Sequence, residues 1–147
     1  MLMKKIGFLS FGHWSPSPHS QTRSASDALL QSIDLAVAAE ELGADGAYFR
    51  VHHFARQLGS PFPLLAAAGA KTKRIEIGTA VIDMRYENPL YMVEDAGAAD
   101  VIGGRLRLGI SRGGADRSHL KKNRAHLVEV RFTFCNNFAV CSFSAKI

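Results

Sequence analysis

The sequence predicts an α/β fold in which parallel strands alternate with helices. Four short apolar segments have the character of strands, and three segments with caps and glycine stops have the character of helices between them. This alternation implies parallel pairing with right-handed crossovers. It fits either an open doubly wound sheet or part of a (β/α)8 barrel. No GxGxxG fingerprint follows the first strand, which argues against a dinucleotide-binding sheet.

The first strand-helix unit begins near the N-terminus. The apolar run Ile6–Phe11 predicts a buried strand, and the polar, proline-containing segment 13–26 predicts a long loop of the kind that often covers a site. Ser26 or Asp27 is expected to cap the helix that follows, and Gly43 is expected to end it.

The next elements repeat this order. Pro63 suits the first turn of the second helix, and Asn88 followed by Pro89 predicts a cap and a first-turn proline for the third. The expected elements are the strand Gly46–Val51, the helix that includes Pro63, the strand Arg74–Val81, the helix Leu90–Ile102 with its stop at Gly103–Gly104, and the strand Arg105–Ile110.

Composition excludes several classes of protein. With 147 residues, 47% of them hydrophobic, the chain can form one domain with a real core. The N-terminal apolar run is too short for a secretory signal and far too short to span a membrane, so we expect a cytoplasmic protein. The two cysteines, Cys135 and Cys141, form no CxxC pair, so we expect neither a zinc site nor a disulfide framework.

The basic charge is concentrated near the C-terminus. Residues 115–147 contain six basic and two acidic residues, a net charge of +4 out of +5 for the chain. A nucleic-acid-binding protein would show basic residues along a defined face with aromatic partners, so we expect no such role. Segment 118–130 can form a helix, and segment 131–147 is aromatic and β-prone. We therefore divide the chain into residues 1–114 and an atypical segment, 115–147.

Polar residues of catalytic type follow each predicted strand. In barrels, the chemistry gathers in the loops after the strands, so this recurrence is the main indication of an enzyme. The residues are His13 after the first strand, His52 and His53 after the second, Asp83 and Arg85 after the third, and Ser111 and Arg112 after the fourth.

Three segments of the chain could support specific chemistry, and each also has a simpler interpretation. The pair His52–His53 can shuttle protons near neutral pH, or be two ordinary loop histidines. The small residues of segment 78–81, which include Thr79, would let a flat ring approach the backbone, or simply pack. Arg112, in a glycine-bearing loop, can bind a phosphate, or be a solvated turn residue.

Taken together, these segments resemble the bacterial luciferase-like flavin monooxygenase family from about Lys5 to Gly114. The similar segments are YFRVHHF, IEIGTAV and ENPLYMVEDAGAADVIGGRLRLGISRG, in the order and spacing of the family. The resemblance implies an eight-stranded barrel that binds FMN at the carboxyl ends of its strands. It also implies that reduced flavin reacts with oxygen to a C4a-peroxide, which oxygenates an aldehyde or another small organic substrate. A separate reductase often supplies the reduced flavin, and some relatives use F420 instead.

The resemblance also assigns residues. His52 matches the catalytic histidine and His53 its neighbour, while Ala80–Val81 matches the place where the flavin ring rests and where a cis peptide often occurs. Arg112 matches a residue that helps to hold the flavin phosphate, and Ser111 would lie beside the ring. Val51 departs from the family, which commonly has glutamate there.

The resemblance covers only the first half of such a barrel, which needs ~250 residues or more. We therefore expect a chain with a truncated, frameshifted or diverged end that dimerises, aggregates or is only marginally stable because its strand edges are exposed, and that is active only with another chain. The alternatives are a non-catalytic remnant, an F420-dependent oxidoreductase, and a metal-dependent barrel hydrolase with the two histidines as ligands.

Overall fold

A computed structural model describes residues 4–112, 129–135 and 138–144. Strands and helices alternate through the first of these ranges, as predicted. They are β1 (Gly7–Ser10), α1 (Ala25–Glu41), β2 (Gly46–Phe49), α2 (Pro61–Lys71), β3 (Glu76–Asp83), α3 (Pro89–Gly103) and β4 (Leu106–Ser111).

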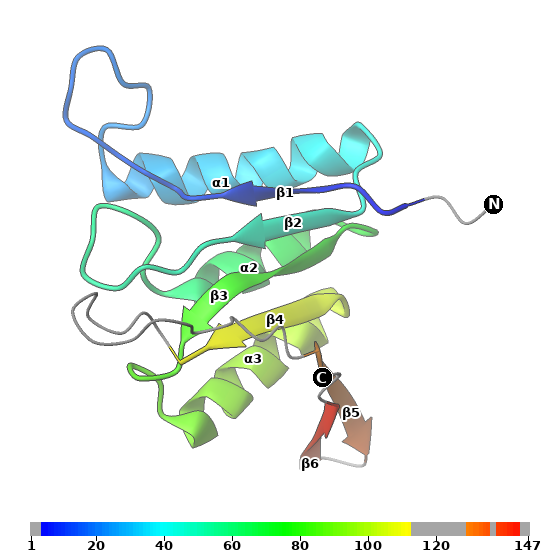
Figure 1. Cartoon of the computed structure of the whole chain (residues 1–147). Helices are drawn as coiled ribbons and strands as arrows, with labels where there is room; N and C mark the ends of the chain where they lie inside the picture. The colour runs from blue at the N-terminus through cyan, green and yellow to red at the C-terminus, as the bar shows by residue number, and fades with distance from the viewer. Residues whose placement is uncertain (1–3, 113–128, 136–137, 145–147) are drawn as a thin grey trace.

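The four strands form one parallel sheet in the order β1-β2-β3-β4. The helices α1, α2 and α3 all lie on one face of this sheet (Figure 1). A doubly wound sheet carries helices on both faces and reverses its strand order at a switch point. Sequential order with helices on one face is instead the arrangement of a (β/α)8 barrel segment, which decides between the two predicted architectures.

Segment 131–147 was predicted to be β-prone, and it contributes to a hairpin. β5 (Glu129–Cys135) pairs antiparallel with β6 (Phe138–Ser144) in a two-stranded sheet separate from the first. The possible helix within 118–130 and the boundary at residue 114 lie largely outside the described residues.

The predicted N-terminal cap of α1 was wrong. Ser24 caps the helix, because its side chain accepts a hydrogen bond from the Asp27 amide while the Asp27 carboxylate accepts from the Ser24 amide. Asp27 is therefore the third helical residue of a capping box, and Ser26 lies inside the first turn. The predicted cap of α3 is confirmed, since the Asn88 side chain accepts from the amides of Leu90 and Tyr91.

Two strands lie slightly further along the chain than predicted. β3 runs over Glu76–Asp83 instead of Arg74–Val81, because the amides of Arg74 and Ile75 donate to the Glu40 carboxylate rather than to a neighbouring strand. β4 includes Ser111, which pairs with Asp83. The glycine stops are confirmed: Gly43 and Gly104 have φ angles of 86° and 68°, which favour glycine.

The core lies between the sheet and its helices. Phe49, Leu65, Ile75 and Ile82 are the largest fully buried apolar side chains. Burial of one such side chain stabilises the fold by about 1.5–3 kcal/mol. No helix in the described part of the chain is long and apolar enough to cross a membrane.

Candidate functional site

The carboxyl ends of β1 to β4 lie at one edge of the sheet, so the loops that follow β1, β2 and β3 lie together (Figure 1). The loops after β1 and β2 are joined by two contacts. Gln57 Nε2 lies 2.5 Å from His13 Nε2, and the Trp14 amide donates to the Arg56 carbonyl at 3.3 Å. His13 is thus held against the loop that carries His52 and His53.

The two adjacent histidines have different surroundings. The His52 side chain is exposed, and the backbone amide of His52 donates to the Leu58 carbonyl at 2.9 Å. The His53 side chain is only 16% exposed, and its Nε2 lies 3.8 Å from Oε1 of Glu87, which is also 16% exposed. The sequence analysis did not single out Glu87, because the chain alone does not show which residues of the β3 loop face the histidines.

Asp83, the last residue of β3, forms an ion pair with Arg85 just after the strand. The Arg85 guanidinium donates to both carboxylate oxygens of Asp83, with Nε at 3.0 and 3.1 Å. This hydrogen bonding lowers the pKa of Asp83 despite partial burial, and the nearby His53 lowers it further. Asp83 is therefore ionised near neutral pH and contributes negative potential beside His53.

The end of β3 is irregular. The Ala80–Val81 peptide is cis, as the family resemblance implies. The β3–β4 register shifts between Thr79 and Ile82, and the buried Thr79 hydroxyl donates to the Gly109 carbonyl at 3.0 Å and accepts from the Gly109 amide at 3.1 Å. A Cβ at Gly109 would lie 2.5 Å from the Thr79 carbonyl oxygen, so this close contact requires glycine.

Ser111, predicted to lie beside the flavin ring, ends β4, and Arg112, predicted to hold the flavin phosphate, follows it. Ser111 Oγ donates to the Ile82 carbonyl at 3.4 Å, which ties β4 to β3 at this edge. Arg112 is exposed. The glycines that complete the predicted loop, Gly113 and Gly114, lie outside the described residues.

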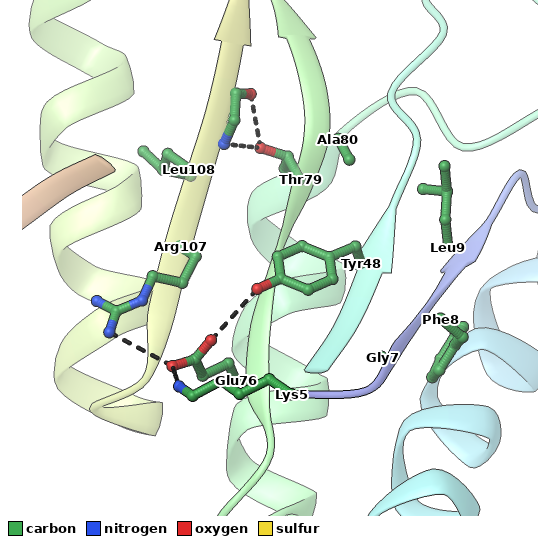
Figure 2. Close-up of a pocket in the computed structure, with 11 residues that line it drawn as sticks. Lys5, Gly7, Phe8, Leu9, Tyr48, Glu76, Thr79, Ala80, Arg107 and Leu108 are labelled. Atoms are coloured by element: carbon green, nitrogen blue, oxygen red, sulfur yellow. Dashed lines mark hydrogen bonds and ion pairs between the residues drawn. The ribbon is translucent and has the colours of Figure 1, made fainter. Parts of the chain in front are cut away.

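An open cavity of about 620 Å³ covers the face of the sheet opposite the helices (Figure 2). Two of the residues predicted to contact flavin, Thr79 and Ala80, line it, whereas Val81 is not among its lining residues. Apolar residues form other walls: Phe8, Leu9 and Leu108. A face with small side chains between apolar ones suits a flat, largely apolar ring.

The sequence analysis missed a charged cluster at the other end of this cavity. Glu76 accepts hydrogen bonds from Lys5 at 2.7 Å, Tyr48 at 3.3 Å and Arg107 at 3.5 Å (Figure 2). The hydrogen bond from Lys5 lowers the pKa of Glu76 against the effect of burial. The alternation in RIEIG, with Ile75 and Ile77 buried in the core, could have indicated that Glu76 faces the cavity.

Among the described residues, no group of three or more His, Cys, Asp or Glu side chains is placed to hold a metal ion. The histidine pair therefore has no further ligands there from which a hydrolase site could be argued.

Comparisons with known proteins identify the family of this chain. The model of a family described as luciferase-like monooxygenase matches residues 5–126. An alkanal monooxygenase alpha chain from Photorhabdus laumondii is 32% identical over 103 residues, which are 68% of this chain and 28% of the relative.

Solved structures share the fold. The oxygenating constituent of 3,6-diketocamphane monooxygenase from Pseudomonas putida, in complex with FMN, aligns with a TM-score of 0.67 at 25% identity over 78% of this chain and 31% of that one. A coenzyme F420-dependent tetrahydromethanopterin reductase from Methanopyrus kandleri aligns with a TM-score of 0.54 at 21% identity over 75% and 27% of the two chains. The chain thus spans about 30% of the length of the relatives it matches.

Proposed function

The chain belongs to the luciferase-like monooxygenase family, and from that premise we propose that it forms part of an FMN-dependent monooxygenase acting on a small organic substrate such as an aldehyde. The observation that carries this proposal is the likeness of its fold to an oxygenating enzyme solved in complex with FMN.

The described residues fit a flavin. Thr79 and Ala80 offer small side chains to the cavity, and Arg112 offers a planar guanidinium for a phosphate at the edge of the same sheet. Ser111 is the last residue of β4, next to Arg112. Val81 would contribute through its backbone. Reduced FMN, when bound, would supply the electrons for the reduction of oxygen, one atom of which enters the substrate.

The protein residues would contribute binding and proton transfer. His52 is exposed at the carboxyl edge and can exchange a proton with a bound substrate, while the less exposed His53 lies beside a carboxylate. The apolar walls of the cavity would limit the access of water to the reacting groups.

Fluorescence titration of FMN with the purified chain tests this proposal. We expect quenching as the flavin binds, with Arg112→Ala weakening FMN more than riboflavin, because only FMN carries the phosphate. Equal weakening of both ligands would refute the role of Arg112. Absence of quenching at high micromolar protein would favour a non-catalytic remnant.

A parallel titration with F420 tests the second candidate cofactor. This candidate has the support of a shared fold with an F420-dependent reductase. F420 binding without FMN binding would replace the monooxygenase proposal with an F420-dependent oxidoreductase.

Partners are also part of the proposal. Substrate and oxygen follow from the monooxygenase reaction, and a separate reductase could supply reduced flavin. Self-association is proposed from the sheet itself: β1 and β4 are its outer strands, and Leu9 in β1 and Phe11 just after it are 45% and 41% exposed. Analytical sedimentation tests it, and a clean, stable monomer over the accessible concentration range would contradict it.

A further inference from the structure

His53 and Glu87 approach each other from different strand exits. His53 follows β2 and Glu87 follows β3, yet His53 Nε2 lies 3.8 Å from Glu87 Oε1. The Nε2 atom is buried, and it has no hydrogen-bond partner in the described part of the chain. A buried, unpaired ring nitrogen is costly, and a small rotation of either side chain would bring the carboxylate within hydrogen-bond distance.

The surroundings of this pair are partly apolar and partly charged. The Tyr86 ring lies 4.9 Å from the His53 ring and packs against one side of it, while the largely exposed Phe54 ring lies 6.3 Å away. The facing charged groups are Asp83, which is paired with Arg85 and interacts with His53, and Asp95, which interacts with Glu87.

Burial raises the pKa of Glu87, while the neighbouring His53 lowers it. His53 therefore influences the proton occupancy of Glu87, and both side chains are only 16% exposed. Val51, the residue before the histidines, is buried and apolar, so it supplies no carboxylate to them.

We propose that Glu87 is a positioning residue that holds His53 through a hydrogen bond from Nε2 to its carboxylate, which gives the site a buried proton-holding pair beside the exposed His52. With the proton on Nε2, the other ring nitrogen of His53 is an acceptor. Catalytic hydrogen bonds are often long before ligands bind and tighten afterwards. The part of this pair in turnover rests on the monooxygenase function proposed above, whereas the coupling of the two groups does not.

The first experiment measures the coupling directly in the whole chain. The Glu87 side-chain carboxyl carbon is followed by ¹³C NMR across a pH titration. We expect His53→Gln to move the Glu87 midpoint to higher pH, because the positive charge that favours the carboxylate is removed. The matched control, His52→Gln, should leave the midpoint in place. An unchanged midpoint in His53→Gln, or equal shifts in both variants, would overturn the proposal.

The second experiment measures turnover with reduced FMN. We expect Glu87→Gln to lower kcat about tenfold with little change in KM, and to have no further effect in a His53→Gln background. Glu87→Asp, which keeps the carboxylate, should recover part of the loss. The positioning role would be overturned if NMR showed that His53 and Glu87 are coupled but Glu87→Gln left turnover and its pH profile unchanged. Absence of flavin binding by the unmodified chain would instead reject the monooxygenase proposal, and the NMR titration would still decide whether the pair exists.

Discussion

The two edges of the four-stranded sheet are built differently. At the amino-terminal edge, charged side chains bind backbone groups: Arg105 donates to carbonyls of Gly69, Thr72 and Ile75, and Glu40 accepts from three consecutive amides. At the carboxyl edge, the buried atoms His53 Nε2 and Gln57 Oε1 have no hydrogen-bond partner among the described residues. Phe54 is 96% exposed there.

This difference separates stability from chemistry. Polar groups at the amino-terminal edge are used by the fold itself, so their loss should destabilise the protein. Polar and aromatic groups at the carboxyl edge contribute less to the fold and are available to a ligand. The same division holds in complete (β/α)8 barrels, where active sites lie at the carboxyl ends of the strands.

The largest effect on stability is expected from Arg105→Ala. The variant loses hydrogen bonds of 2.9 to 3.2 Å to three carbonyls in a part-buried setting. We expect a loss of about 3 kcal/mol in the free energy of unfolding, measured by urea denaturation. Arg23→Ala is the matched control at the other edge, since Arg23 also donates to two carbonyls but is exposed. Equal losses in both variants would abolish the distinction between the edges.

His52→Ala should show the opposite behaviour. The exposed imidazole contributes little to packing, so the urea midpoint should stay within the error of the unmodified chain. FMN affinity should remain nearly intact, while turnover falls about 100-fold if the histidine transfers a proton. Steady-state kinetics and flavin titration measure these quantities. Weakened flavin binding with normal turnover of the bound fraction would argue against the catalytic role.

A smaller, pH-dependent effect is expected from Glu40→Gln. Burial disfavours the ionised carboxylate, but hydrogen bonds from the amides of Ile75, Arg74 and Lys73 outweigh it and lower the pKa of Glu40 below its ordinary value of 4.5. This stabilisation is present above pH 4.5 and is lost as the pH falls through the lower folded-state value.

The variant should therefore lose about 1 kcal/mol at pH 7, a modest amount because solvent screens the site, and less at pH 3. Urea midpoints at the two pH values measure this difference. Glu41→Gln, at the neighbouring exposed position, is the control. A loss in Glu40→Gln that does not change with pH would exclude the ionised carboxylate as its source.

The smallest effect is expected from Phe54→Gly. Phe54 has a φ of 58°, a conformation that glycine adopts without the cost paid by a side chain. The relief of this cost exceeds the added flexibility of the unfolded chain, so we expect a gain of about 0.5 kcal/mol in the free energy of unfolding. Phe54→Ala, which removes the ring but keeps Cβ, should leave stability nearly unchanged. A loss in both variants would show that the ring stabilises the fold.

Much of the fold could be predicted because its determinants are local. Glycine stops and the Asn88 cap are determined by short segments, and alternation of strands with helices implies parallel pairing. Boundaries were less predictable. β3 begins later than predicted because the amides just before it donate hydrogen bonds to the Glu40 carboxylate, which is distant in sequence. The choice between a barrel segment and an open sheet needed the strand order, which is a tertiary property.

The candidate site was predicted only in outline. Strand exits identify which loops meet, so His53 and Asp83 could be expected at one edge. The approach of His53 Nε2 to Glu87 Oε1 depends on how the loops after β2 and β3 fold against each other. No helical or strand periodicity in the sequence predicts such a contact between loops. The Glu76 cluster was missed for a different reason, because a charged residue within a strand is more often taken for a solvent-facing one.

The irregular end of β3 has a consequence for how such a site can diverge. Ala80 and Val81 lie where the β3–β4 register shifts. Beside them, the Thr79 hydroxyl forms hydrogen bonds with both the carbonyl and the amide of Gly109. A molecule lying against this stretch would meet main-chain atoms as much as side chains. Binding through main-chain atoms would tolerate substitutions of side chains, provided that the register shift and Gly109 are retained. Relatives with different chemistry could therefore bind their ligands against the same stretch of main chain while their side chains differ.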